Sequence, residues 1–292
     1  MKILLREIRK CLKLSQTELA ERLKVSFAAV NRWENGHALP NALAQAELFA
    51  LCEGEGVPVY ELTLGRIEEQ RKACSVAGDR MLLYHASKSG IAGKIRPISR
   101  PECDFGTGFY MGDEISQALT LVCDYDDSKL YIVSLDVSKF ETLKVKADLE
   151  WALLVAFHRG RMEAVKGTPF YEKYSRAFLK KDLVIGSIAN DRIFYVVDNF
   201  FQGHITDIAL TESLSALRLG KQYVAVTQKA CDCVKIEKEI ELSYLEREFI
   251  KKVAEEKRET GIKLANKICK DKRREGLFFD EILEAKKRGK QC

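Results

Sequence analysis

Two helix-start signals that lie close together constrain the N-terminal part of the chain most strongly. In "SQTELAERLKVSFAAVNRWENG" (residues 15–36), Ser15 precedes a helical pattern and Glu18 follows three positions later, as in a capping box. Ser26 is a second N-cap residue, and Gly36 is placed to end the helix that Ser26 starts. The spacing predicts two short helices joined by a tight turn, with further helices before and after them.

This layout resembles the XRE/Cro repressor family of helix-turn-helix proteins, in which the second helix lies in the major groove of DNA. The resemblance implies that residues 15–35 contact double-stranded DNA. Gln16, at the start of the first helix, would bind a phosphate. The implied positions on the second helix are Ser26, Phe27, Ala28, Asn31 and Arg32. Asn31 and Arg32 suit adenine and guanine edges respectively. The alternative is a helical interaction module that no longer binds DNA.

Length, charge and cysteine content limit the number of domains, the partners and the cellular compartment of the chain. A chain of 292 residues is long for one domain, so two domains are expected. The net charge of +5 permits contact with nucleic acid but does not argue for it. No apolar run reaches the length of a membrane span, and the N-terminus lacks a signal-peptide pattern, so no membrane partner is expected. The nine cysteines are an odd number, which favours reduced thiols in the cytoplasm. No metal site is expected.

Changes in composition divide the chain into four segments. Residues 1–52 form the helical domain, and the polar, glycine-containing residues 53–80 are interpreted as a partly helical, mobile connector, in which "RIEEQRK" (66–72) shows no apolar stripe. Residues 81–240 form the second domain. Residues 241–292 are a helical tail whose amphipathic stripe is expected to dock on its own domain.

The second domain alternates short apolar runs with helical patterns. Strands are predicted in "MLLYHAS", "KLYIVSLDV", "ETLKVK", "LVIGSI", "RIFYVV" and "QYVAVT", and helices in residues 148–159, 170–179 and 206–219. This order predicts an α+β domain with largely antiparallel sheets.

Three segments of this domain carry residues suited to binding a ligand. In "DFGTGFYMGDEISQAL" (104–119), Gly106 and Gly108 let the backbone adopt unusual angles or approach a ligand closely. Phe109 and Tyr110 are expected to point to opposite faces of a strand, one into the core and one into a cleft. The earlier segment "LLYHAS" places His85 and Ser87 on one face, and Gln222 begins a later strand.

Together, "LYHAS", "DFGTGFYMGDEISQA" and "QYVAV" resemble the three signature segments of the PARP/diphtheria-toxin-like ADP-ribosyltransferases, over roughly residues 81–236. The pattern is most similar to a bacterial branch found beside XRE-type regulators in toxin–antitoxin-like loci. The resemblance implies NAD as substrate or ligand. His85 would bind a ribose hydroxyl, Ser87 the nicotinamide amide, and Tyr110 would stack on the nicotinamide ring next to Gly108.

The chain departs from that pattern at two positions. Ala86 stands where the family has glycine, and Gln222 stands where it has its catalytic glutamate. A glutamine amide binds a hydroxyl but cannot act as a base or offset an oxocarbenium charge. Polymer formation is therefore not expected.

Asp191 and Arg192, in "IANDR", are candidates to supply the missing charge and to bind a pyrophosphate. The alternative is that they form a polar hairpin turn between two strands, and both interpretations stay open.

Three functions remain open from the sequence. The first is a DNA-binding, NAD-dependent mono-ADP-ribosyltransferase, in one form a self-regulating toxin with an antitoxin partner and an unidentified ADP-ribose acceptor. The second is a transcriptional regulator whose second domain only senses NAD or a related nucleotide. The third is a non-catalytic interaction scaffold. A homodimer is compatible with each.

Overall fold

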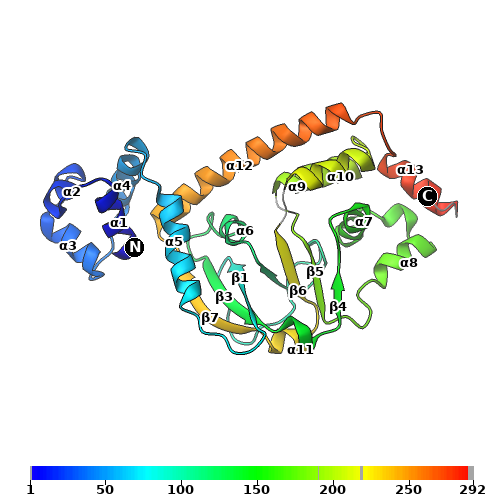
Figure 1. The fold of residues 1–292 in the computed structure, drawn as a ribbon, viewed down its shortest axis with the longest axis horizontal. Coiled ribbons are helices and arrows are strands. Elements are labelled where there is room, and N and C mark those ends of the chain that lie inside the picture. The colour runs from blue at the N-terminus through cyan, green and yellow to red at the C-terminus, as the bar shows by residue number, and fades with distance from the viewer. Residues whose placement is uncertain (1, 190, 218–219, 289–292) are drawn as a thin grey trace.

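The computed structural model describes residues 2–189, 191–217 and 220–288. Five helices form an N-terminal domain, a sheet domain follows, and a long C-terminal helix runs along both (Figure 1). The N-terminal helices are α1 (Lys2–Cys11), α2 (Gln16–Arg22), α3 (Phe27–Asn35), α4 (Ala42–Gly54) and α5 (Val59–Lys72).

The capping residues act as the sequence predicts. The Ser15 hydroxyl accepts a hydrogen bond from the Glu18 backbone N–H (3.2 Å), and the Glu18 carboxylate accepts one from the Ser15 backbone N–H (2.7 Å). Ser26 caps α3, and Gly36 ends it with a φ of 76°. The predicted pair of short helices is therefore confirmed.

The second domain is built on one mixed sheet of seven strands in the order β4-β5-β6-β2-β1-β3-β7. The strands are β1 (Met81–Ser87), β2 (Phe109–Gly112), β3 (Lys129–Leu135), β4 (Thr142–Lys144), β5 (Leu183–Ser187), β6 (Lys221–Ala225) and β7 (Lys235–Glu241). Only β4 and β5 pair in parallel among the described strands, and the other neighbours are antiparallel.

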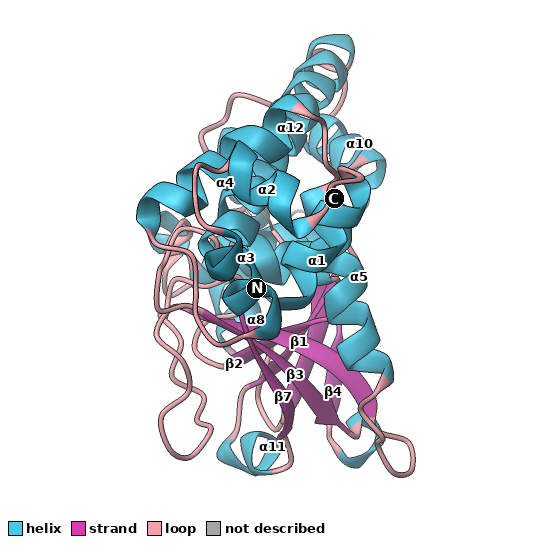
Figure 2. Ribbon diagram, turned by 90° about the vertical axis from the view of Figure 1, so that its left-hand side faces the viewer, coloured by secondary structure: helices cyan, strands magenta, loops and turns pink. Residues whose placement is uncertain are grey.

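Most helices cover one face of this sheet, while the short α11 lies on the other side (Figure 2). The helices are α6 (Ile115–Thr120), α7 (Leu149–His158), α8 (Pro169–Ser175), α9 (Asp191–Phe201), α10 (Asp207–Ala216) and α11 (Gln228–Asp232), with 3-10 turns at Val137–Lys139 and Glu163–Val165. Trp151 of α7 is fully buried, and its indole N–H donates to the carbonyl of Ser187. The helical face therefore holds the larger core.

One predicted strand is a helix. "RIFYVV" lies within α9 and not in a strand. Its β-branched and aromatic residues favour a strand locally. However, Ile193, Val196, Val197 and Phe200 are all buried, and their spacing of three and four residues places them on one face of a helix. Packing therefore outweighs local propensity here.

The connector agrees in part with the sequence-based interpretation. It contains α5, which buries Val59, Tyr60, Thr63 and Ile67 at helical spacing. The expected partial helix is present, and most of its apolar stripe precedes the charged "RIEEQRK" segment, in which only Ile67 is buried among the residues of α5. Charged residues between these positions hide the stripe in the linear sequence.

The tail consists of α12 (Tyr244–Asp271) and α13 (Phe279–Lys287). As expected, α12 packs on helices of its own domain, α9 and α10, but it also contacts α4 and α5 of the N-terminal domain. Leu245 and Phe249 lie in the same apolar cluster as the helix-turn-helix core. Nearby, the guanidinium of Arg66 in α5 donates two hydrogen bonds to one carboxylate oxygen of the fully buried Glu246. The C-terminal helix thus completes the core of the N-terminal domain.

Two further features concern the described residues as a whole. None of their helices is both long enough and apolar enough to cross a membrane. Their cysteines are free thiols, several of them buried.

We expect Leu245→Ala to lower the free energy of unfolding by about 2–5 kcal/mol, because it opens a cavity in a shared core. The matched control is Leu264→Ala on the same helix, where the leucine is 40% exposed. That change should cost less than about 1 kcal/mol. Urea unfolding of the full chain measures both, and equal losses would contradict the role given to α12.

Candidate functional site

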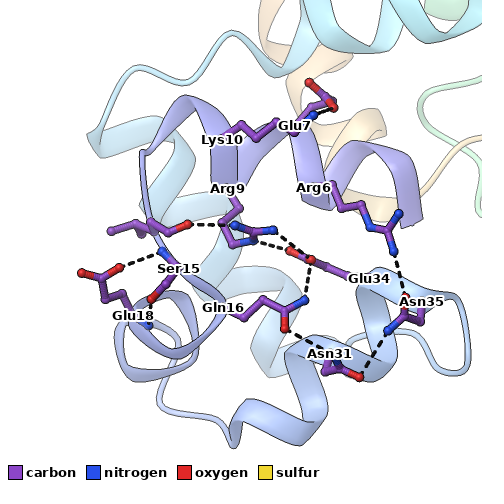
Figure 3. A network of polar contacts seen from close by, with 11 residues as sticks. Arg6, Glu7, Arg9, Lys10, Ser15, Gln16, Glu18, Asn31, Glu34 and Asn35 are labelled. Atoms are coloured by element: carbon purple, nitrogen blue, oxygen red, sulfur yellow. Dashed lines mark hydrogen bonds and ion pairs between the residues drawn. The ribbon is translucent and has the colours of Figure 1, made fainter.

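A polar network fixes α2 against α3 (Figure 3). Asn31 donates to the side-chain oxygen of Gln16 (3.2 Å), and Gln16 donates to Glu34 (2.7 Å). Glu34 is buried and forms an ion pair with Arg9 (2.6 Å). Burial acts to raise the pKa of Glu34, but hydrogen bonds from Arg9 and Gln16 outweigh it and hold that pKa below its ordinary value. Glu34 therefore stays ionised and anchors the network.

The outer face of α3 is open to solvent. Ser26, Ala28 and Arg32 are exposed, and the Phe27 side chain is 51% exposed. Gln16 and Asn31 are partly exposed, and each amide nitrogen keeps a second hydrogen beyond the bonds described. The residues predicted to contact DNA thus form one surface, and two of them also hold its shape.

In the second domain, His85 lies near the end of β1. Its Nδ1 is 2.6 Å from the carbonyl oxygen of Tyr110, and since a carbonyl only accepts, Nδ1 carries the hydrogen. Burial lowers the pKa of His85, so the ring is neutral at pH 7 and Nε2 is an acceptor. The ring stacks on Phe109 with centroids 4.1 Å apart. Ser87, two residues on, donates its hydroxyl hydrogen to the carbonyl of Gly90.

Tyr110 lies on the other face of the sheet. Phe109 and Tyr110 belong to different apolar clusters, as their alternation predicts. Because His85 stacks on Phe109, its side chain and that of Tyr110 point to opposite faces. The Tyr110 hydroxyl donates to the carbonyl of Gly106 (2.7 Å) and accepts from the backbone N–H of Phe105 (3.1 Å). The structure therefore does not bring the His85 and Tyr110 side chains into the single cleft that the sequence predicts.

The two glycines of this segment face protein atoms. Gly106 has a φ of 67°, and a Cβ there would lie 2.8 Å from Nδ1 of His158. A Cβ at Gly108 would overlap the Val224 side chain on the neighbouring strand. Close packing of the glycine segment on β6 and α7 therefore accounts for both glycines.

Gln222 lies on the Tyr110 face and is buried in a network around Asp104. Its amide nitrogen donates to the Asp104 carboxylate (3.0 Å) and to the carbonyl of Ser187 (2.8 Å). Asp104 also accepts from the Arg159 guanidinium and from the backbone N–H of Ala189. The Asp104 carboxylate thus lies within hydrogen-bond distance of position 222, where the ADP-ribosyltransferases that the sequence resembles have a glutamate. It comes from the glycine segment and not from β6.

Asp191 and Arg192 begin α9, so they are not in a hairpin turn between two strands. Their side chains lie outside the described residues, and the proposed catalytic and pyrophosphate-binding roles stay predictions.

Comparison with known families covers both parts of the chain. Residues 81–236, more than half of the 292, match the model of a family described as "Protein of unknown function (DUF3990)". The chain belongs to the DUF3990 family. Residues 5–61 match a helix-turn-helix family model, which supports a DNA-binding regulator. Neither the curated proteins nor the solved structures gave a match.

Sequence reasoning missed two residues of the DUF3990 domain that the structure singles out. The sequence marks Asp104 only as the start of the glycine segment, and its partner Gln222 lies 118 positions away. His158 follows an apolar helical run that indicates no role for it, but it lies against the glycine segment, and its Nε2 is buried without a hydrogen-bond partner among the described residues. Asp104 precedes a strand in a glycine-rich loop, which is a weak signal for a site; nothing local marks His158.

We expect Gln222→Glu to destabilise the DUF3990 domain by about 3 kcal/mol, because it sets two buried carboxylates side by side. Adding Asp104→Asn should recover at least about 1 kcal/mol of that loss. In the double variant the amide at position 104 donates a hydrogen bond to the carboxylate at position 222, which reverses the direction of the original bond. The matched control is Gln228→Glu, since Gln228 also donates to a carboxylate and a carbonyl but is only partly buried. Thermal unfolding measures all three. A double variant no more stable than Gln222→Glu would contradict the pairing.

Proposed function

We propose that the chain is a DNA-binding regulator whose DUF3990 domain senses NAD or a closely related nucleotide. The observation that carries the DNA-binding part is the solvent-exposed face of α3, held rigid by the Gln16–Asn31–Glu34 network. This geometry suits base contacts from Arg32 and phosphate contacts from Gln16.

The NAD part rests on the three signature segments together with the state of His85. A neutral imidazole that is oriented by Nδ1 presents Nε2 as an acceptor for a ribose hydroxyl. The Ser87 oxygen keeps acceptor capacity for an amide N–H. Both side chains leave β1 on the same face, so one nucleoside can reach them together.

Sensing is favoured over transfer by the state of Gln222. Its amide hydrogens are occupied by Asp104 and Ser187, and the side chain is 4% exposed. It also lies on the opposite face of the sheet from His85. A ligand bound at His85 therefore does not meet the position at which the resembled family has its glutamate.

The route from sensing to regulation is α12. It contacts α6, α9 and α10 of the DUF3990 domain and α4 and α5 of the DNA-binding domain. A ligand that shifts the packing of the DUF3990 domain would thus change the position of the helix-turn-helix.

A mono-ADP-ribosyltransferase is the second candidate, and the Asp104 carboxylate favours it. In such a reaction the bond from ribose C1′ to nicotinamide breaks, and nicotinamide leaves with the electron pair. The acceptor then bonds to C1′ and loses a proton. For this candidate NAD would have to bind on the Tyr110 face of the sheet, where Asp104 lies one hydrogen bond from position 222 and would stabilise the positive charge on the ribose. A toxin function, an antitoxin partner and an ADP-ribose acceptor belong to this candidate alone.

We expect Arg32→Ala to cost about 1–3 kcal/mol of binding to the specific site, because Arg32 reads a base edge. Fluorescence anisotropy with the full chain and DNA from upstream of its own gene measures the loss. Arg288→Ala, at the C-cap of α13, which lies far from α3 (Figure 1), is the matched control for the loss of one positive charge. An equal loss on random DNA would show that Arg32 contacts only phosphate.

We expect NAD to bind the full chain with modest affinity and His85→Ala to remove most of that binding, because the ribose hydroxyl loses its acceptor. The matched control is His204→Ala, since His204 is exposed in a turn and bonds only Asn199 among the described residues. Isothermal titration calorimetry measures both. Wild-type protein that gives no heat with NAD would contradict both the sensor and the transferase.

A further inference from the structure

An open groove lies between the glycine segment before β2 and the chain that leads into β5. Its volume is about 660 Å³, and its walls include Phe105, Gly106, Phe178, Lys180 and Thr227. Sites for small ligands commonly enclose about 300–1,000 Å³ and are lined by aromatic groups with a few polar ones. The groove contains neither His85 nor Ser87, so it is separate from the NAD site proposed above.

The groove is lined by an imidazole whose hydrogen-bonding capacity is unused. The His158 ring lies nearly parallel to Phe178, with centroids 4.8 Å apart and 17° between planes. Its Nε2 has no hydrogen-bond partner among the described residues. Burial lowers the pKa of His158 to about 4, so the ring is neutral at pH 7, and Nδ1 is the nitrogen that lies beside Gly106 in the groove wall. Gly106 keeps the other edge of the ring clear, since a side chain there would strike Nδ1.

The rim of the groove is positively charged. Lys180 is exposed, has a φ of 60°, and forms no ion pair within the described part of the chain. The Lys181 ammonium forms only a long ion pair with the Glu141 carboxylate, with 3.7 Å between nitrogen and oxygen. The one acid in the lining, Asp182, is already held by Lys229 at 2.6 Å. An anionic group at this rim would therefore meet uncompensated positive charge.

We propose that this groove binds a nucleotide-type ligand, with a planar heteroaromatic ring against the phenylalanine and His158 rings and a phosphate at Lys180. Aromatic walls favour a flat ring, and the lysines favour a phosphate. The ligand would also contact His158, which directly precedes Arg159 in the chain. The Arg159 guanidinium donates a hydrogen bond to Asp104. Binding in the groove would thus alter the packing around the Asp104–Gln222 network.

Adenosine monophosphate is the test ligand, titrated into the full chain by calorimetry, with adenosine and inorganic phosphate as its two halves. Lys180→Asn removes the cation and keeps a residue that tolerates positive φ. It should weaken binding of the monophosphate about tenfold, as expected for losing one charge-assisted hydrogen bond. The matched control is Lys13→Asn, because Lys13 is exposed and has a φ of 56° in the other domain. His158→Phe keeps a ring on Phe178 but loses the imidazole nitrogens, and it should also weaken binding.

Three results would overturn the proposal. One is no saturable heat with millimolar adenosine monophosphate. Another is adenosine binding as tightly as the monophosphate, because the lysines would then play no part. The third is binding that survives Lys180→Asn and His158→Phe but is lost in His85→Ala, which would assign the nucleotide to the NAD site. Thermal unfolding of each variant shows that it is folded before its binding is compared.

Discussion

The packing of α12 across both domains is the constraint on which the rest of the structure depends. Leu245 and Phe249 fill the core of the helix-turn-helix domain, while the same helix continues over α9 and α10. The buried Arg66–Glu246 pair fixes its start, since breaking such a pair costs about 3–5 kcal/mol. The DNA-binding domain is therefore a part of the same packed body as the DUF3990 domain, and a change in one alters the other.

Within the DUF3990 domain, the Asp104 carboxylate likewise holds separate elements together. It joins the glycine segment to α7 through Arg159 and to β6 through Gln222. This explains why an amide and not an acid stands at position 222, since an acid there would face the Asp104 carboxylate. The carboxylate beside position 222 is that of Asp104, and it is balanced by the Arg159 guanidinium.

Features set by local chemistry could be predicted from the sequence. The Ser15 and Ser26 caps and the Gly36 stop depend on neighbours within four residues, and each acts as expected. Alternation along β2 also correctly separates Phe109 from Tyr110. Features set by distant contacts could not be predicted. Helix α9 reads as a strand because its apolar stripe is visible only once the core is known. The opposite faces of His85 and Tyr110 follow from strand pairing, as does the meeting of Asp104 with Gln222.

These contacts describe a DNA-binding regulator in which the helix-turn-helix and DUF3990 domains share one helix. The central claim is that the proposed NAD site and the DNA-binding surface are energetically coupled, and coupling between sites is reciprocal. The most direct test is the affinity of the full chain for its specific DNA, measured with and without saturating NAD at fixed salt. The account predicts a change of about fivefold or more, as is typical of coupled sites. An unchanged affinity, with NAD shown to be bound, would contradict it.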